Sequence, residues 1–158
     1  MPNHHEIRTL PYTAQQMYDL VADVPSYPKF IPWNSAARIR SRKATPEGEV
    51  LDAELVISFK VFREKFGSRV VLLPARHRIE TEYLDGPFRH MLSTWAFRDL
   101  PTGGCEVDFL VDFEFRNAIL RAVIGVVFND AMLRIVRAFE RRAAELYGPG
   151  NGRVAQGR

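Results

Sequence analysis

Residues 117–147 read NAILRAVIGVVFNDAMLRIVRAFERRAAELY, and this stretch decides the fold. Its apolar residues recur at intervals of three and four, which is the period of one face of an α-helix. Asn117 can cap the first turn, and Gly148-Pro149 is a usual helix stop. About thirty residues at 1.5 Å each make a rod of roughly 45 Å, long enough to cross a small domain. We therefore predict a long C-terminal helix around which the rest of the chain folds. Its buried face is expected to hold Ile124, Phe128, Met132, Ile135, Val136, Phe139, Ala143 and Leu146.

The chain before this helix alternates apolar and polar residues in six consecutive segments separated by turn residues. This pattern is typical of an antiparallel meander with one face in water. A further strand is expected at 5–10, followed by a capping box from Thr13 to Gln16 that starts a short helix. The proline-rich segment 23–33 can hold one more helical turn. The six alternating segments are 36–42, 51–58, 62–72, 77–83, 90–98 and 105–115.

These elements predict an α+β helix-grip fold, in which a curved antiparallel sheet of about seven strands wraps around the long C-terminal helix. Two short helices follow the first strand. Residues 1–148 are expected to form a single domain, and the Gly-rich tail 149–158 is expected to be disordered. We expect His4 and His5, at the start of the chain, to be exposed to solvent.

Composition sets only broad bounds on function. Apolar residues make up 46% and charged residues 26% of the 158 residues, as in an ordinary globular protein, and the net charge of +3 is too small to decide between anionic partners. The single cysteine, Cys105, excludes an internal disulfide. No signal peptide or membrane span is recognisable, so we expect a soluble cytoplasmic protein that can touch the inner face of a membrane, with no DNA partner.

Sequence signatures of catalysis are absent. The four histidines lack metal-ligand spacing, and the chain has no GxSxG, Walker or GxGxxG motif. We therefore expect no catalytic residue, no metal and no cofactor. Glu64 is the one candidate acid or base, because an inward-facing buried carboxylate would have a raised pKa. Alternatively, the Glu64 carboxylate is paired with an arginine or lies at the rim of the sheet's concave side.

A curved sheet that grips one helix often leaves a hollow on its concave side, and such hollows favour apolar ligands. The inward-facing positions are mostly aromatic and aliphatic. Two readings stay open: a core filled by its own side chains, or an apolar pocket with a few polar anchors. Burying about 300 Å² of ligand is worth roughly 7 kcal/mol, enough for micromolar capture of a hydrocarbon. The polar minority at inward-facing positions is Glu64, Ser68, His77, Thr81 and Ser93.

Two surfaces have open interpretations. The start of the long helix, 119–128, is apolar nearly all round and needs cover from the sheet, a second subunit or lipid. Arginine and lysine residues in 38–43, 63–69 and 76–78 fall on adjacent strands, where they could meet phosphate on RNA or lipid. Glutamates on the same strands, among them Glu54, favour a mixed, solvated face instead.

The segment 21–33, VADVPSYPKFIPW, resembles the opening motif of the coenzyme Q-binding proteins of the START-like superfamily. Further matches are Gly86-Pro87-Phe88 leading to Trp95-Ala96-Phe97, and 138–148, so that the resemblance covers residues 5–148. The same superfamily includes bacterial ribosome association toxins, polyketide cyclases and dehydratases. One departure is Asn34, where many relatives have cysteine.

The resemblance implies a helix-grip fold with a deep apolar tunnel and a non-enzymatic role in binding ubiquinone, or a related polyisoprenoid lipid, in support of respiration. One alternative is a protein that binds the large ribosomal subunit through the basic sheet face and blocks subunit joining. Another is a cyclase or dehydratase that uses Glu64 or Tyr83. The residues expected at the ligand, the first four in a lid-like segment, are Tyr27, Phe30, Pro32, Trp33, Leu55, Glu64, Phe66, Tyr83, Trp95, Phe113, Val123 and Val127.

Overall fold

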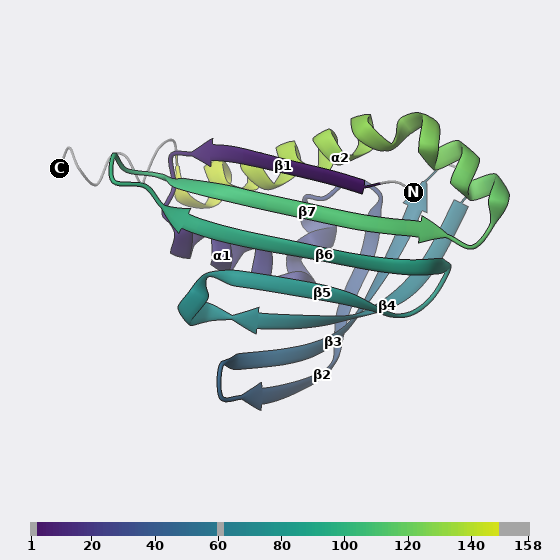
Figure 1. Cartoon of the computed structure of the whole chain (residues 1–158), viewed down its shortest axis with the longest axis horizontal. Helices are drawn as coiled ribbons and strands as arrows, with labels where there is room; N and C mark the ends of the chain where they lie inside the picture. The colour runs from purple at the N-terminus through teal and green to yellow at the C-terminus, as the bar shows by residue number, and fades with distance from the viewer. Residues whose placement is uncertain (1–2, 60–61, 149–158) are drawn as a thin grey trace.

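The structure is a computed structural model, and it describes residues 3–59 and 62–148. One antiparallel sheet takes up most of the chain, and a single long helix lies across it (Figure 1). In chain order the elements are β1 (Asn3–Leu10), α1 (Ala14–Ala22), the 3-10 helix η1 (Val24–Lys29), β2 (Asn34–Thr45), β3 (Gly48–Phe59), β4 (Phe62–Leu73), the 3-10 turn η2 (Pro74–Arg76), β5 (Arg78–Asp85), β6 (Phe88–Asp99), β7 (Cys105–Phe115) and α2 (Ala118–Tyr147).

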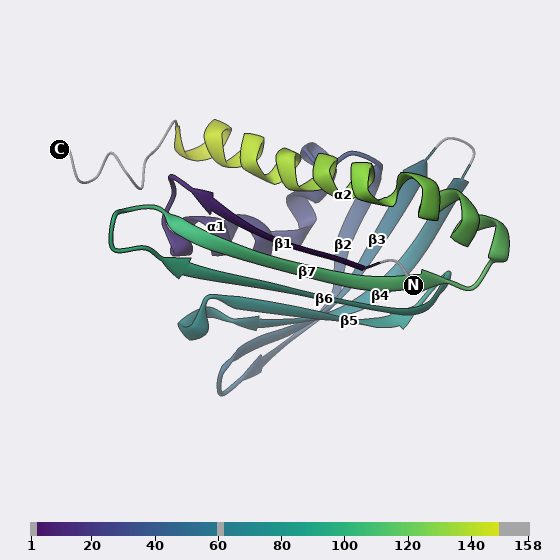
Figure 2. The same ribbon diagram turned by 45° about the horizontal axis from the view of Figure 1, so that its top comes forward.

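The seven strands lie in the order β1-β7-β6-β5-β4-β3-β2, so that β2 to β7 form a meander and β1 pairs with β7. The sheet bends strongly, and α1, η1 and α2 all lie on its concave side (Figure 2). The predicted helix-grip architecture is therefore confirmed. The predicted tail 149–158 lies outside the described residues.

Local chemistry explains where the helices begin and end. The predicted capping box at α1 is present, since the Thr13 hydroxyl accepts from the backbone N–H of Gln16 and the Gln16 amide accepts from that of Thr13. The Asn117 side chain caps α2 by accepting from the N–H groups of Ile119 and Leu120. At the other end, Gly148 has a φ of 77° and donates to the carbonyl of Ala144, which ends the helix.

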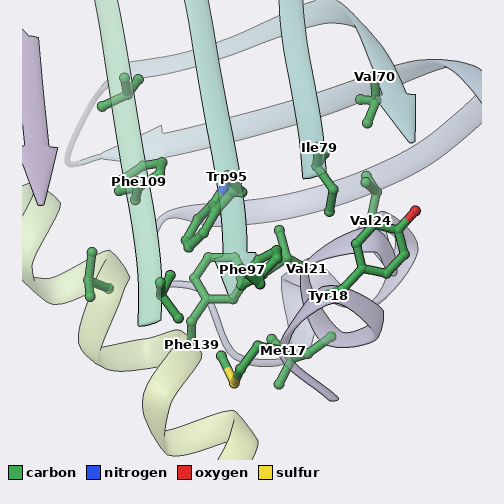
Figure 3. Close-up of a cluster of buried hydrophobic side chains, with 14 of the residues drawn as sticks. Met17, Tyr18, Val21, Val24, Val70, Ile79, Trp95, Phe97, Phe109 and Phe139 are labelled. Atoms are coloured by element: carbon green, nitrogen blue, oxygen red, sulfur yellow. The ribbon is translucent and has the colours of Figure 1, made fainter. Parts of the chain in front are cut away.

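The core lies between the concave face and the helices (Figure 3). Strand β7 buries every second residue from Cys105 to Phe115, as the alternation predicts. Met17 and Val21 of α1 and Phe139 of α2 point toward the same region of the sheet, where Trp95 and Phe97 project from β6. These contacts place α1 and the second half of α2 firmly against the sheet.

The burial of α2 differs from the prediction at both of its ends. Phe128, Val136, Phe139 and Ala143 are buried as expected, but Leu146 is half exposed. At the start of the helix, Ile119 and Val126 are 74% and 86% exposed, because the first turns run past the end of β7 (Figure 2).

The first strand also differs from the prediction, because His4 is largely buried and was expected to be exposed to solvent. Its side chain is only 14% exposed, its Nε2 lies 2.7 Å from Glu6 Oε1, and its ring faces Phe128 of α2. Arg8, on the same face of β1, contacts both Glu6 and Glu140 of α2. Polar residues of β1 thus fasten α2 to the edge of the sheet.

Candidate functional site: a cavity between the sheet and the long helix

A cavity of about 220 Å³, partly open to solvent, lies on the concave side of the sheet. Its walls are the central strands, the second half of α2, and the segment from the start of η1 to the start of β2 (residues 24–34), which we call the η1–β2 segment. The lining residues are Val24, Tyr27, Ile31, Pro32, Trp33, Asn34, Leu55, Ile57, Phe66, Ser68, Val70, Ile79, Thr81, Met91, Ser93, Trp95, Phe109, Val111, Met132, Ile135 and Phe139.

The η1–β2 segment is held rigidly at one side of the cavity. The Tyr27 hydroxyl donates to the carbonyl of Val21 at 2.5 Å, and its ring packs edge-on against Phe139. Trp33 has a φ of 67°, a left-handed conformation that costs a bulky residue about 1–3 kcal/mol. The carbonyl of Trp33 accepts from the N–H of Ser58 at 2.7 Å, which helps to hold this conformation. A strained aromatic residue fixed in a cavity wall is typical of a ligand site.

The sheet wall is largely aromatic. Trp95 stacks on Phe109 with 4.1 Å between ring centroids, and Phe139 of α2 approaches Trp95 to 5.0 Å. Val70 and Ile79 extend the same surface along β4 and β5 (Figure 3). Such a wall attracts flat or branched hydrocarbon groups through area burial and dispersion.

No residue with a charged side chain is among the described lining residues. Tyr27 is the one titratable group there, and burial raises the pKa of its hydroxyl. The polar atoms of the wall belong to Asn34, Ser68, Thr81 and Ser93. The cavity is therefore suited to an uncharged molecule, because a buried unpaired charge is costly.

Six of the residues expected at the ligand do line the cavity: Tyr27, Pro32, Trp33, Leu55, Phe66 and Trp95. Phe30 lies behind the wall, where it packs on Phe139 at 5.2 Å and under the guanidinium of Arg142. Phe113 packs on Phe88 and Phe128 in the core beyond the cavity.

Glu64 and Tyr83 were expected at the ligand, and the structure places neither in the described lining. The Tyr83 hydroxyl accepts from the N–H of Phe88, and Glu64 lies near the start of β4, where it pairs with Ile57 of β3. Both residues face inward, but the alternation that predicts the face gives no position along the strand. Val123 is also outside the lining and half exposed, on the uncovered start of α2, while the side chain of Val127 lies outside the described part of the structure.

Several lining residues were missing from the predicted site. The alternation of β5 and β7 already indicates Ile79, Phe109 and Val111 as inward-facing, and the helical period indicates Met132 and Ile135. Nothing in the sequence tells which inward residues meet the hollow and which meet another element. That choice depends on the curvature of the sheet.

A family model described as polyketide cyclase/dehydrase and lipid transport matches residues 10–140. The chain belongs to this family. A START superfamily protein from Mycobacterium smegmatis shares the fold, with a TM-score of 0.77 over 91% of this chain and 98% of that one at 16% identity. An 18 kDa protein from Caulobacter crescentus is 33% identical, with a TM-score of 0.78 over 94% of this chain and 99% of that one.

Two kinds of family member are among the curated relatives. The ribosome association toxin RatA of Rickettsia prowazekii is 38% identical over 92% of this chain and 99% of its own length. The mitochondrial coenzyme Q-binding protein COQ10 homolog B of Xenopus laevis is 32% identical over 92% of this chain, which spans 59% of that protein. The predicted membership of a START-like family with both kinds of relative is therefore confirmed.

The convex face of the sheet, on which many of the basic residues lie, is not a free cationic patch. Arg38 and Arg40 donate to Glu54 at 2.7 and 2.9 Å, and Arg40 reaches on to Asp85 at 3.0 Å. Arg40 passes over Gly67, where a Cβ atom would lie 2.5 Å from its Nη1. Further along, Arg42 pairs with Glu49, and Arg69 with Asp52. The prediction that glutamates make this a mixed face of basic and acidic side chains is confirmed.

The carboxylate of Glu54 gives this face a pH-dependent contribution to stability. Hydrogen bonds from Arg38 and Arg40 lower its pKa from 4.5 to about 2. A lowered native-state pKa stabilises the fold above the unfolded-state pKa, and this contribution is lost as the pH falls through the native value. Glu54→Gln should therefore lower the urea midpoint at pH 7, and the difference from the unmodified protein should shrink between about pH 4.5 and pH 2. Glu47→Gln, at an exposed turn position without an ion pair among the described residues, is the control and should show no such pH-dependent difference.

Neither a membrane-spanning helix nor a metal site is found in the described part of the chain. None of its helices is long and apolar enough to cross a membrane. No group of three or more His, Cys, Asp or Glu side chains is arranged there to hold a metal ion. Cys105 is buried at the start of β7, and burial raises the pKa of its thiol to about 12, so it is a poor nucleophile.

Proposed function

We propose that this protein binds a neutral polyisoprenoid lipid, with ubiquinone as the leading candidate, between its sheet and α2. The observation that carries the proposal is the uncharged, aromatic-lined cavity of about 220 Å³. Membership of a lipid-transport family and similarity to a protein named coenzyme Q-binding also support it. In this role the protein holds a quinone for respiratory electron transport and releases it again.

The cavity volume limits how much of the ligand is enclosed. Pockets for drug-sized ligands measure about 300–1,000 Å³, so this cavity, at about 220 Å³, is smaller than that range. It suits a substituted ring with the first part of a tail, and the rest of the tail would leave through the open side. Partial burial gives reversible, micromolar binding, as a carrier needs.

The proposed role is non-enzymatic. The candidate acid–base groups, Glu64 and Tyr83, do not line the cavity, and the Tyr27 hydroxyl is engaged by the Val21 carbonyl. We place the protein in the cytoplasm, with peripheral contact at the inner face of the membrane. The exposed apolar side chains at the start of α2, Ile119, Val123 and Val126, are suited to such contact.

Organic extraction and mass spectrometry of the purified protein test the proposal directly. Ubiquinone or another neutral prenyl lipid should co-purify. A short-tail ubiquinone should also quench the fluorescence of Trp95 and Trp33 with a micromolar Kd, since both side chains line the cavity. A clean extract together with an absence of quenching would reject the quinone role.

A second candidate function is association with the large ribosomal subunit. Among the curated relatives, the Rickettsia protein favours this function over the quinone role, because it is named a ribosome association toxin and is matched over 99% of its length. The Xenopus protein, which supports the quinone role, is matched over only 59% of its length. The paired convex face makes a poor RNA contact. Arg137 and Arg141 are exposed on α2 and have no carboxylate partner among the described residues, so they are better placed to meet phosphate.

Co-sedimentation with purified large ribosomal subunits tests this second function. The double variant Arg137→Glu/Arg141→Glu should bind at least about tenfold more weakly, because two phosphate-facing charges are reversed. The matched control is Arg42→Gln, an exposed arginine already neutralised by Glu49. Equal loss in both variants would point to general charge effects, and no co-sedimentation of the unmodified protein would reject the function.

A further inference from the structure

Three hydroxyl groups form a continuous polar row on the sheet wall of the cavity, and we name Ser68, Thr81 and Ser93 the hydroxyl row. Thr81 of β5 lies directly opposite Ser93 of β6. Thr81 also pairs with Val70 of β4, so Ser68, two residues away, is its diagonal neighbour on the same face. Directly opposed residues have Cβ atoms about 5 Å apart and diagonal ones about 7–8 Å. One ring-sized group can therefore touch all three hydroxyls.

The hydroxyl row has no hydrogen-bond partner within residues 3–59 and 62–148. Ser68 is only 2% exposed, yet it faces the cavity. Most polar groups in protein interiors have a hydrogen-bond partner, so hydroxyls that face a cavity without a protein partner are available to a ligand. On the β2 wall of the same cavity, Asn34 Oδ1 is the one fully buried side-chain polar atom of the described residues that has no partner. The sheet thus keeps hydrogen-bonding capacity that the fold itself does not use.

The walls formed by α2 and by the segment before β2 are largely apolar, and they carry no charged side chain among the described residues. Met132, Ile135 and Phe139 come from α2, and Ile31 and Pro32 from the η1–β2 segment. A ligand in the cavity therefore meets donors on its sheet side and hydrocarbon on its helix side. A fatty-acid carboxylate or a phosphate would find no cation among the described lining residues.

We propose that the hydroxyl row is a subsite for the oxygen atoms of a neutral, oxygenated ring, which lies flat between the sheet and α2. The ring class includes quinones, whose carbonyl and ether oxygens accept hydrogen bonds, and prenylated phenols, whose hydroxyls both donate and accept. The subsite selects such rings over hydrocarbons of the same shape and over anionic lipids. This inference rests on the proposed lipid-binding function and specifies its ligand chemistry.

The test uses Ser68→Ala, Thr81→Val, Ser93→Ala and the triple variant, titrated with a ubiquinone that carries one isoprene unit. Each single change should weaken binding by about three- to tenfold, as expected for one neutral hydrogen bond, and the triple change by at least about 30-fold. An oxygen-free prenylbenzene should bind each variant as well as it binds the unmodified protein, or more tightly. Thr94→Val, on the opposite face of the same strand β6, is the control and should leave both affinities unchanged.

A thermal melt separates this role from a structural one. The Ser68 hydroxyl makes no hydrogen bond to the described residues, so Ser68→Ala should melt at the same or a higher temperature while it binds quinone more weakly. If the unmodified protein binds the quinone and the triple variant binds it equally well, the hydroxyl row is not the subsite and the proposed function stands. Equal binding of a fatty acid would overturn the neutral-ring selectivity. If the unmodified protein binds no quinone, the proposed function fails and the subsite with it.

Discussion

Replacing Phe139 by alanine is expected to lower the free energy of unfolding by about 3–5 kcal/mol. Phe139 is 4% exposed and joins α2 to the rest of the molecule through three rings, Tyr27, Phe30 and Trp95, at centroid distances of 5.6, 5.2 and 5.0 Å. Alanine removes the apolar burial and the aromatic contacts together and leaves a void next to the existing cavity. Urea unfolding followed by circular dichroism measures the change.

Two further variants show whether the effect comes from the ring or from the helix. Phe139→Leu keeps much of the apolar volume and should cost clearly less than the alanine variant. Val126→Ala, at an 86% exposed position of the same helix, should change stability by no more than about 0.5 kcal/mol. If Phe139→Ala cost less than about 1 kcal/mol, this contact would not hold α2 against the sheet, and α2 would not form the wall of the cavity that the structure shows.

Much of this fold is predictable from the sequence because each element carries its own signal. Strand β7 alternates without a break, and the Thr13–Gln16 capping box marks the start of α1. The start of α2 shows the limit of such signals. Ile119 and Val126 read as residues that need cover, but the helix runs past the sheet and they stay exposed. Periodicity tells which face is apolar, and only the relative length of the neighbouring elements tells whether anything covers it.

The candidate site is less predictable because it depends on contacts between elements that are distant in the sequence. Glu64 and Tyr83 face the side of the sheet that was predicted, yet they lie outside the described lining. Arg40 reaches from β2 to Asp85 of β5, a contact that requires the register of four strands and a glycine beneath it. Alternation carries no information on sheet curvature, so it cannot separate residues at the hollow from residues in the filled core.

Filling the cavity from α2 is expected to weaken quinone binding strongly, with little effect on the fold. Ile135 is a partly exposed lining residue on α2, so a tryptophan at this position would occupy the space that the ring needs. Excluding about 100 Å² of ligand surface removes roughly 2.5 kcal/mol at 25 cal/mol/Å², which corresponds to about a 60-fold higher Kd. The measurement is quinone titration by tryptophan quenching, with a thermal melt to confirm folding. Val126→Trp introduces the same side chain at an exposed position of the same helix and should leave the Kd unchanged.

The same variant separates the two candidate functions, because the cavity and the outward side of α2 are different surfaces of one helix. Ile135→Trp should lose quinone binding and keep any association with ribosomal subunits. The Arg137→Glu/Arg141→Glu variant should show the reverse, since neither arginine lines the cavity. If Ile135→Trp instead lost both activities while remaining folded, occupancy of the cavity would control the outer surface, and the bound lipid would regulate ribosome association. If it lost neither, the quinone would not bind between the sheet and α2, and this cavity would have to be abandoned as its binding site.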